Sequence, residues 1–92
     1  MIQSVRHKGL RRLYEDDDPR GVIAEHVVKL HDILARLDAS GSAADLDVAG
    51  FKLHPLKGDR RGFWAITVRA NWRVIFRFED GDALDVDYVD YH

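Results

Sequence analysis

Residues 64–88 read WAITVRANWRVIFRFEDGDALDVDY, and this stretch decides the fold. Within it, apolar and polar side chains alternate with the period of two that half-buried strands show. The three alternating runs are residues 64–70, 72–78 and 84–88. Asn71 lies at the first corner, and the acidic segment 79–82 forms the second. The pattern predicts a small antiparallel sheet with one apolar face.

A further strand is expected upstream, because Phe51 and Leu53 alternate with Lys52 and His54 before Pro55 closes the run. His54 then points away from the core. A turn rich in glycine and charge leads from this strand into the next one.

The loop between the last two strands sets their register. A two-residue loop at Asp80-Gly81 would place Phe76 opposite Asp85 and mix core with solvent faces. A three-residue loop with Gly81 in the left-handed conformation places Phe76 opposite Leu84 instead. The pattern therefore predicts a three-residue loop with a glycine bulge.

With that register, Arg73 lies opposite Asp87. One sheet face packs on helices, and the other is open. The open face is expected to show His54, Arg69, Arg73 and Arg77.

Two helices are predicted in the first forty residues. Residues 7–15 place apolar side chains at helical spacing, and Val22 to Asp38 carries one continuous apolar stripe. Residues 1–5 are expected to form a short strand, and 39–50 a connecting loop. The sequence thus predicts one α+β domain, residues 1–92, with two N-terminal helices covering one face of an antiparallel-dominated sheet.

Composition excludes several classes of protein. The chain is 46% hydrophobic and 33% charged, which is typical of a globular domain, and it has no cysteine for disulfides or thiolate metal sites. No apolar run is long enough to cross a bilayer, and no signal-peptide core is recognisable, so a cytoplasmic protein without a membrane partner is expected.

The net charge of −2 hides a strong segregation of charge. Residues 51–77 carry seven Lys or Arg against one Asp, a local charge of +6, whereas residues 78–92 carry six acids and no Lys or Arg. Such a basic segment is typical of an electrostatic binding surface. Pairing of the basic strands with the acidic last strand is an equally simple interpretation, and the two are compatible.

His54 and the final residues Asp90-Tyr91-His92 are candidates for acid–base chemistry. Cleavage of RNA without a metal needs a base for the 2′-hydroxyl proton, an acid for the leaving 5′-oxygen, and cations for the phosphate. Histidine suits either proton-transfer role. The simpler interpretations are an exposed strand residue for His54 and a frayed chain end for His92.

Basic side chains near these residues are candidate phosphate contacts. They are Lys57, Arg60, Arg61, Arg69, Arg73 and Arg77, each of which could also be an ordinary surface charge. Asn71 could read a base edge or serve only as a turn residue. Trp64 and Trp72 alternate with core positions and are expected to pack inside. Histidine spacing argues against a metal site, and no cofactor is predicted.

Several short motifs resemble those of the HigB-type toxins (host inhibition of growth, or plasmid-maintenance killer proteins) of the RelE/ParE superfamily. They are Arg6-His7-Lys8-Gly9-Leu10, Leu53-His54-Pro55-Leu56-Lys57-Gly58-Asp59, Gly62-Phe63-Trp64, Asn71-Trp72-Arg73, Phe76, Gly81-Asp82-Ala83 and Asp90-Tyr91-His92. The resemblance covers essentially the whole chain.

That resemblance implies the toxin of a type II toxin–antitoxin pair, a metal-independent endonuclease that cuts messenger RNA on the ribosome. Its implied partners are a HigA-like helix-turn-helix antitoxin and the ribosome with its messenger, with operator DNA bound only through the antitoxin. The family's catalytic positions fall on His54, Asp90, Tyr91 and His92, its phosphate-stabilising positions on Lys57 and Arg73, and a messenger-reading position on Asn71. Which histidine is acid and which is base stays open.

Two alternatives remain at this stage. A ParE-like toxin would share the fold but inhibit DNA gyrase without cutting RNA, and it would have no need for His54 and the Asp90-Tyr91-His92 end. A non-enzymatic protein would use the basic face only to bind an acidic partner or DNA.

Overall fold

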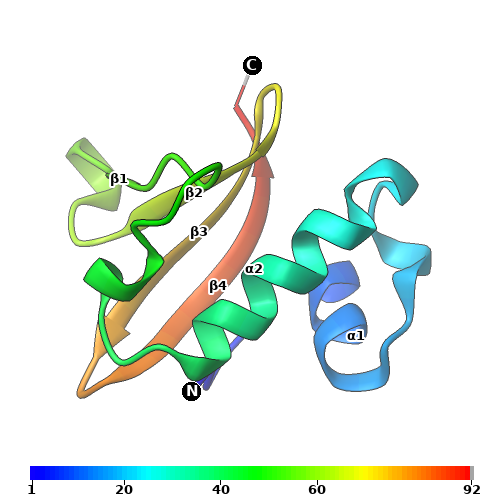
Figure 1. Ribbon diagram of the computed structural model, residues 1–92, viewed down its shortest axis with the longest axis horizontal. Coiled ribbons are helices and arrows are strands. Elements are labelled where there is room, and N and C mark those ends of the chain that lie inside the picture. The colour runs from blue at the N-terminus through cyan, green and yellow to red at the C-terminus, as the bar shows by residue number, and fades with distance from the viewer. Residues whose placement is uncertain (92) are drawn as a thin grey trace.

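The computed structural model describes residues 1–91 and shows a four-stranded antiparallel sheet with two helices packed on it (Figure 1). The strands lie in the order β1-β2-β3-β4. Their bounds are β1 His54–Pro55, β2 Trp64–Arg69, β3 Trp72–Glu79 and β4 Asp82–Asp90, and those of the helices are α1 Lys8–Asp16 and α2 Val27–Ala39. The predicted α+β fold is confirmed.

One hydrophobic core lies between the helices and the sheet. The stripe of α2 and the apolar face of the strands meet there, and α1 adds Leu10 and Leu13. Fully buried members from the other elements include Leu30, Ile33, Leu37, Ile66, Val74, Phe76 and Val86. Each such side chain stabilises the fold by roughly 1.5–3 kcal/mol. Trp64 and Trp72 pack against this core, as expected.

The helices begin and end close to the predicted positions, with one exception. His7 caps α1 through its Nδ1, which accepts the N–H of Leu10 at 3.0 Å. The second helix begins at Val27 rather than Val22, after a 3₁₀ turn at Ala24–His26. Val22 lies outside because its backbone is extended (φ −129°, ψ 167°) where the chain leaves the preceding turn.

The predicted loop between β3 and β4 was wrong. Glu79 pairs with Asp82, so the loop is the two-residue Asp80-Gly81, with φ of 52° and 83°. Both angles are positive, as a tight hairpin turn of this kind requires. The loop that the hydrophobic pattern seemed to exclude is therefore present.

The pattern is restored by a bulge inside β4. The register shifts between the pairs Ile75–Asp87 and Arg77–Leu84, and Asp85 adopts φ 52° at the extra position. The extra residue turns Val86 and the residues after it back toward the core. As a consequence Arg73 pairs with Val89, not with Asp87 as predicted.

Both outer segments of the sheet differ from the predicted strands. β1 has only two residues, because Lys52 has a positive φ of 51° that interrupts an extended backbone. The N-terminal segment forms isolated parallel bridges, Ile2 to Ala83 and Val5 to Val86, alongside β4. No helix within residues 1–91 is long and apolar enough to cross a membrane.

Candidate functional site

The sheet face turned away from the helices, here called the outer face, carries part of the predicted site. Directly paired residues point to the same face. His54 pairs with Ala65, Ala65 with Ile75 and Ile75 with Asp87, so these four side chains form one row across the sheet. Arg73 lies in the next row, between Thr67 and Val89. The prediction that His54 and Arg73 share a face is therefore confirmed.

Tyr91 is held beside this face by two contacts. Its N–H donates to the carbonyl of Asn71 at 2.8 Å, which ties it to the turn between β2 and β3. Arg60 donates from Nη1 to the Tyr91 hydroxyl at 3.0 Å and lies over the ring, 5.6 Å from its centre. Alternation after Val89 puts the Tyr91 side chain on the outer face. These two contacts hold the chain in place as far as Tyr91, so the described part of this segment is not frayed.

Asp90 lies on the opposite side of β4. It pairs with Trp72, whose ring packs 4.5 Å from that of Tyr88 on the helix side. Strand alternation therefore separates Asp90 from His54 and Tyr91. His92, the fourth predicted catalytic residue, lies outside the described residues.

His54 has a defined tautomer in its neutral form. Its Nδ1 lies 2.9 Å from the carbonyl oxygen of Lys52. Because a carbonyl only accepts hydrogen bonds, Nδ1 must carry the hydrogen, and the lone pair of the neutral ring is on Nε2. Nε2 is then the nitrogen that can accept a proton from a substrate.

Arg73 and Lys57 differ in how they are held. Nη1 of Arg73 donates to the carbonyls of Ala70 and Trp72, at 2.5 and 3.1 Å, while its buried Nε has no hydrogen-bond partner within residues 1–91. Lys57 is exposed just before the 3₁₀ turn at Gly58–Arg60. Asn71 is exposed in its turn and contributes the backbone carbonyl that holds Tyr91.

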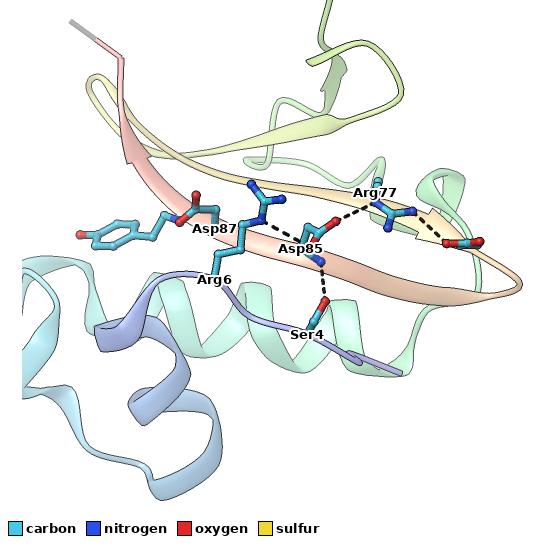
Figure 2. Close-up of polar contacts among 7 residues, drawn as sticks. Ser4, Arg6, Arg77, Asp85 and Asp87 are labelled. Carbon is cyan, nitrogen blue, oxygen red and sulfur yellow. Dashed lines mark hydrogen bonds and ion pairs between the residues drawn. The ribbon is translucent and has the colours of Figure 1, made fainter. Parts of the chain in front are cut away.

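Arg77, another predicted phosphate contact, is occupied by acids of the same sheet (Figure 2). It pairs with Asp85 at 2.8 Å and with Glu79 at 2.9 Å, and Arg6 reaches Asp85 at 3.4 Å. The hydrogen bond from Arg77 lowers the pKa of Asp85, and the same bond raises the pKa of Arg77. Pairing of basic and acidic strands therefore explains Arg77, whereas no ion pair with an acid is seen for Arg60 or Arg73 within residues 1–91.

Two features were not found by sequence reasoning. Arg60 was one of six basic candidates, and nothing in its spacing indicated the contact with Tyr91. His26 is buried, and its Nδ1 lies 2.5 Å from the hydroxyl of Tyr88, which joins the start of α2 to the end of β4. Only its spacing, four residues before the buried Leu30, could have suggested that His26 faces the core.

Comparison with known proteins gives consistent matches. The family described as "RelE-like toxin of type II toxin-antitoxin system HigB" matches residues 3–92. Endoribonuclease HigB of Proteus vulgaris is 49% identical over 92 residues, covering 100% of both chains. Toxin HigB-1 of Vibrio cholerae serotype O1 (strain ATCC 39315 / El Tor Inaba N16961) is 33% identical over 94 residues, covering 100% of this chain and 98% of the relative.

The fold is also found in a solved structure. A YoeB/ParE toxin from Agrobacterium tumefaciens has a TM-score of 0.65 to this chain at 22% identity, with 100% of this chain and 99% of that chain covered. At this identity the likeness shows the fold alone. The family match over residues 3–92 and the two similar toxins show that the chain belongs to the HigB family of RelE-like toxins of type II toxin–antitoxin systems.

Proposed function

We propose that this protein is an endoribonuclease that cuts messenger RNA held by the ribosome, through attack of the 2′-hydroxyl on the adjacent phosphate. The observation that carries the proposal is the hydrogen bond between Arg60 and Tyr91, which joins Tyr91 to the basic loop after Lys57, beside the face that holds His54 and Arg73. The 49% identical relative from Proteus vulgaris is named an endoribonuclease.

The predicted site residues other than Asp90 each have a role in this reaction. Nε2 of His54 would take the 2′-hydroxyl proton, and His92 would return a proton to the leaving 5′-oxygen. Arg73 and Lys57 stabilise the charge that develops on the phosphate. Tyr91 positions the RNA, whereas Asp90, on the other side of β4, is given no part in the proton transfers. Asn71 reads a base of the messenger.

The ribosome is needed because the site is an open sheet face that cannot align an RNA strand alone. Alignment of the 2′-hydroxyl, phosphate and leaving oxygen is worth several powers of ten in rate. A HigA-like helix-turn-helix antitoxin is the proposed inhibitor, and operator DNA is bound only through it. A protein that acts on the ribosome and binds this antitoxin would work in the cytoplasm.

His54→Ala and His92→Ala test the nuclease function. Loss of a general acid or base should lower messenger cleavage on ribosomes by about 10²–10⁴-fold. His31→Ala is the matched control, since His31 is exposed on α2 and pairs with Asp17 at 3.2 Å. All variants should still copurify with the antitoxin, and the wild type should cut free RNA poorly.

Growth inhibition that persists undiminished in both histidine variants would overturn the nuclease proposal. Inhibition of gyrase by those same variants would then assign the protein to the ParE-like class.

A further inference from the structure

Arg60 contacts Tyr91 through its side chain, yet the proposed reaction gives it no role. Its Nη1 donates to the Tyr91 hydroxyl at 3.0 Å, and its guanidinium carbon lies 5.6 Å from the centre of the ring. A charged hydrogen bond to the hydroxyl and a cation over the ring restrain different parts of the same side chain. Arg60 therefore holds the side chain of Tyr91 in one orientation.

The loop that carries Arg60 is itself held by its backbone. The N–H of Arg60 donates to the carbonyl of Lys57 at 3.4 Å, and its carbonyl accepts the N–H of Phe63 at 3.0 Å. The N–H of Leu56 donates to the carbonyl of Phe63 at 2.9 Å and closes the loop at its base. The backbone of Tyr91 is also tied down, as described above. Arg60 therefore joins two segments that are each held in place.

The surroundings of Arg60 do not favour a direct contact with phosphate. Arg60 borders a pocket of about 230 Å³ on the outer face. Three carboxylates line the same pocket: Asp59, Asp85 and Asp87. The other arginine in the lining, Arg6, is paired with Asp85 at 3.4 Å. Because negative charge at this place repels a phosphate, Arg60 is better suited to holding Tyr91 than to holding RNA.

The contact with Arg60 also determines what the Tyr91 hydroxyl has left to offer. Its oxygen accepts a hydrogen bond from the guanidinium, so its own hydrogen is available to donate. The phosphate oxygens of RNA accept hydrogen bonds, and such a donor matches them. Without Arg60 the ring would rotate among several orientations, and only a fraction of them would present the donor to the phosphate.

We propose that Arg60 is a positioning residue for RNA cleavage, which holds Tyr91 so that the Tyr91 hydroxyl donates to a phosphate oxygen of the messenger. The proposal rests on the proposed nuclease function. Arg60 acts through Tyr91 and does not itself bind the RNA. A group that improves alignment raises the rate of the chemical step, whereas a group that holds RNA changes the binding of substrate.

A double-mutant cycle tests this role by single-turnover messenger cleavage on ribosomes. Arg60→Ala should lower the maximal rate about 10- to 100-fold, the usual value of a hydrogen bond to a charged group. In the Tyr91→Phe background the same substitution should lower that rate by less than about threefold, because the hydroxyl that Arg60 holds is gone. The toxin concentration at half of the maximal rate should stay within about twofold of wild type.

Arg61→Ala is the matched control, since it removes the same charge from the next position of the loop. Arg61 is exposed at the end of the 3₁₀ turn that contains Arg60. Any loss through charge alone should be the same factor with Tyr91 and with Tyr91→Phe, and both arginine variants should unfold at the wild-type urea midpoint. Equal losses for Arg60→Ala in the two backgrounds, or a loss seen only in the half-saturating concentration, would overturn the proposal.

NMR of the purified toxin supplies a readout that needs no cleavage. The Hδ protons of Arg60 should resonate upfield of their usual position, because the ring that Arg60 covers shields them. Tyr91→Leu should return them to that position, and absence of the shift in wild type would also overturn the proposal. A wild type that shows the shift but does not cut messenger on ribosomes would instead refute the nuclease function on which the role of Arg60 depends.

Discussion

Asp38 joins three parts of the chain at a single carboxylate. Its Oδ1 accepts the backbone N–H of Ile2 at 2.9 Å and the hydroxyl of Tyr14 at 2.8 Å. The hydrogen bond from Ile2 holds the pKa of Asp38 below its usual value, and the hydrogen bond from Tyr14 adds a smaller effect in the same direction. Burial of Tyr14, and to a smaller extent its hydrogen bond to Asp38, raises the pKa of Tyr14 to about 12. The N-terminal segment, α1 and α2 therefore depend on Asp38 being ionised.

The stabilisation from Asp38 should depend on pH in one direction. Because its folded pKa is below the unfolded value of about 3.9, the contribution is complete above that value and is lost as the pH falls through the folded pKa. In urea denaturation, wild type should lose stability between pH 5 and pH 3 more steeply than Asp38→Asn. At pH 7 the variant should be about 1 kcal/mol less stable. Equal pH slopes for the two proteins would contradict this, and Asp32→Asn serves as the exposed control.

At the scale of elements, alternation and the helical stripe were sufficient to predict the sheet and both helices. The position of the bulge was not predictable, because hydrophobic alternation shows that one extra residue is needed but not where it lies. Asp80-Gly81 forms a two-residue turn by itself, so the extra residue is Asp85 instead. There the Oγ of Ser4 accepts the N–H of Asp85 at 2.8 Å. That contact joins residues 81 positions apart, which local pattern cannot reveal.

α1 packs on the turn after it at a contact that only glycine allows. A Cβ on Gly9 would lie 2.0 Å from the carbonyl oxygen of Gly21, which is backbone and cannot rotate away. Gly9→Ala should therefore destabilise the protein by about 1–3 kcal/mol in urea denaturation, although alanine favours helices. Gly41→Ala is the control, since nothing lies within 4 Å of its added Cβ. A Gly9→Ala protein as stable as this control would show that the contact is looser than described.

At the scale of the whole molecule, the sequence shows that basic and acidic residues lie in separate segments. It does not show which basic residues pair with acids of the fold and which are left for binding. Arg73 and Arg77 are the same residue type, four positions apart on β3. The bulge decides between them, because it brings Asp85 to Arg77 and leaves Arg73 beside Val89. The outer face carries three of the predicted site residues, His54, Arg73 and Tyr91. Asp90 lies on the other face, because side chains alternate between the two faces up to the end of β4.

The N-terminal segment is also bonded along the free edge of β4. The N–H of Gln3 donates to the carbonyl of Ala83 at 2.8 Å, on the side of β4 that β3 leaves uncovered. Gln3→Pro removes this donor and should cost about 1–3 kcal/mol of stability by urea denaturation. The side chain of Gln3 is exposed, so Gln3→Ala should stay within about 0.5 kcal/mol of wild type. Similar losses in both variants would mean that the backbone bond contributes little.

The N-terminal bridges have a consequence for recognition. One border of the sheet is covered by residues 1–6, and the opposite border is the two-residue β1, which ends in Pro55. Proteins that bind by adding a strand need a row of unpaired backbone N–H and C=O groups at the edge of the sheet. A proline or a very short edge strand leaves too few of these groups. Within residues 1–91 the two borders of the sheet therefore offer little open backbone for an added strand, and we expect an antitoxin to contact this toxin mainly through side chains.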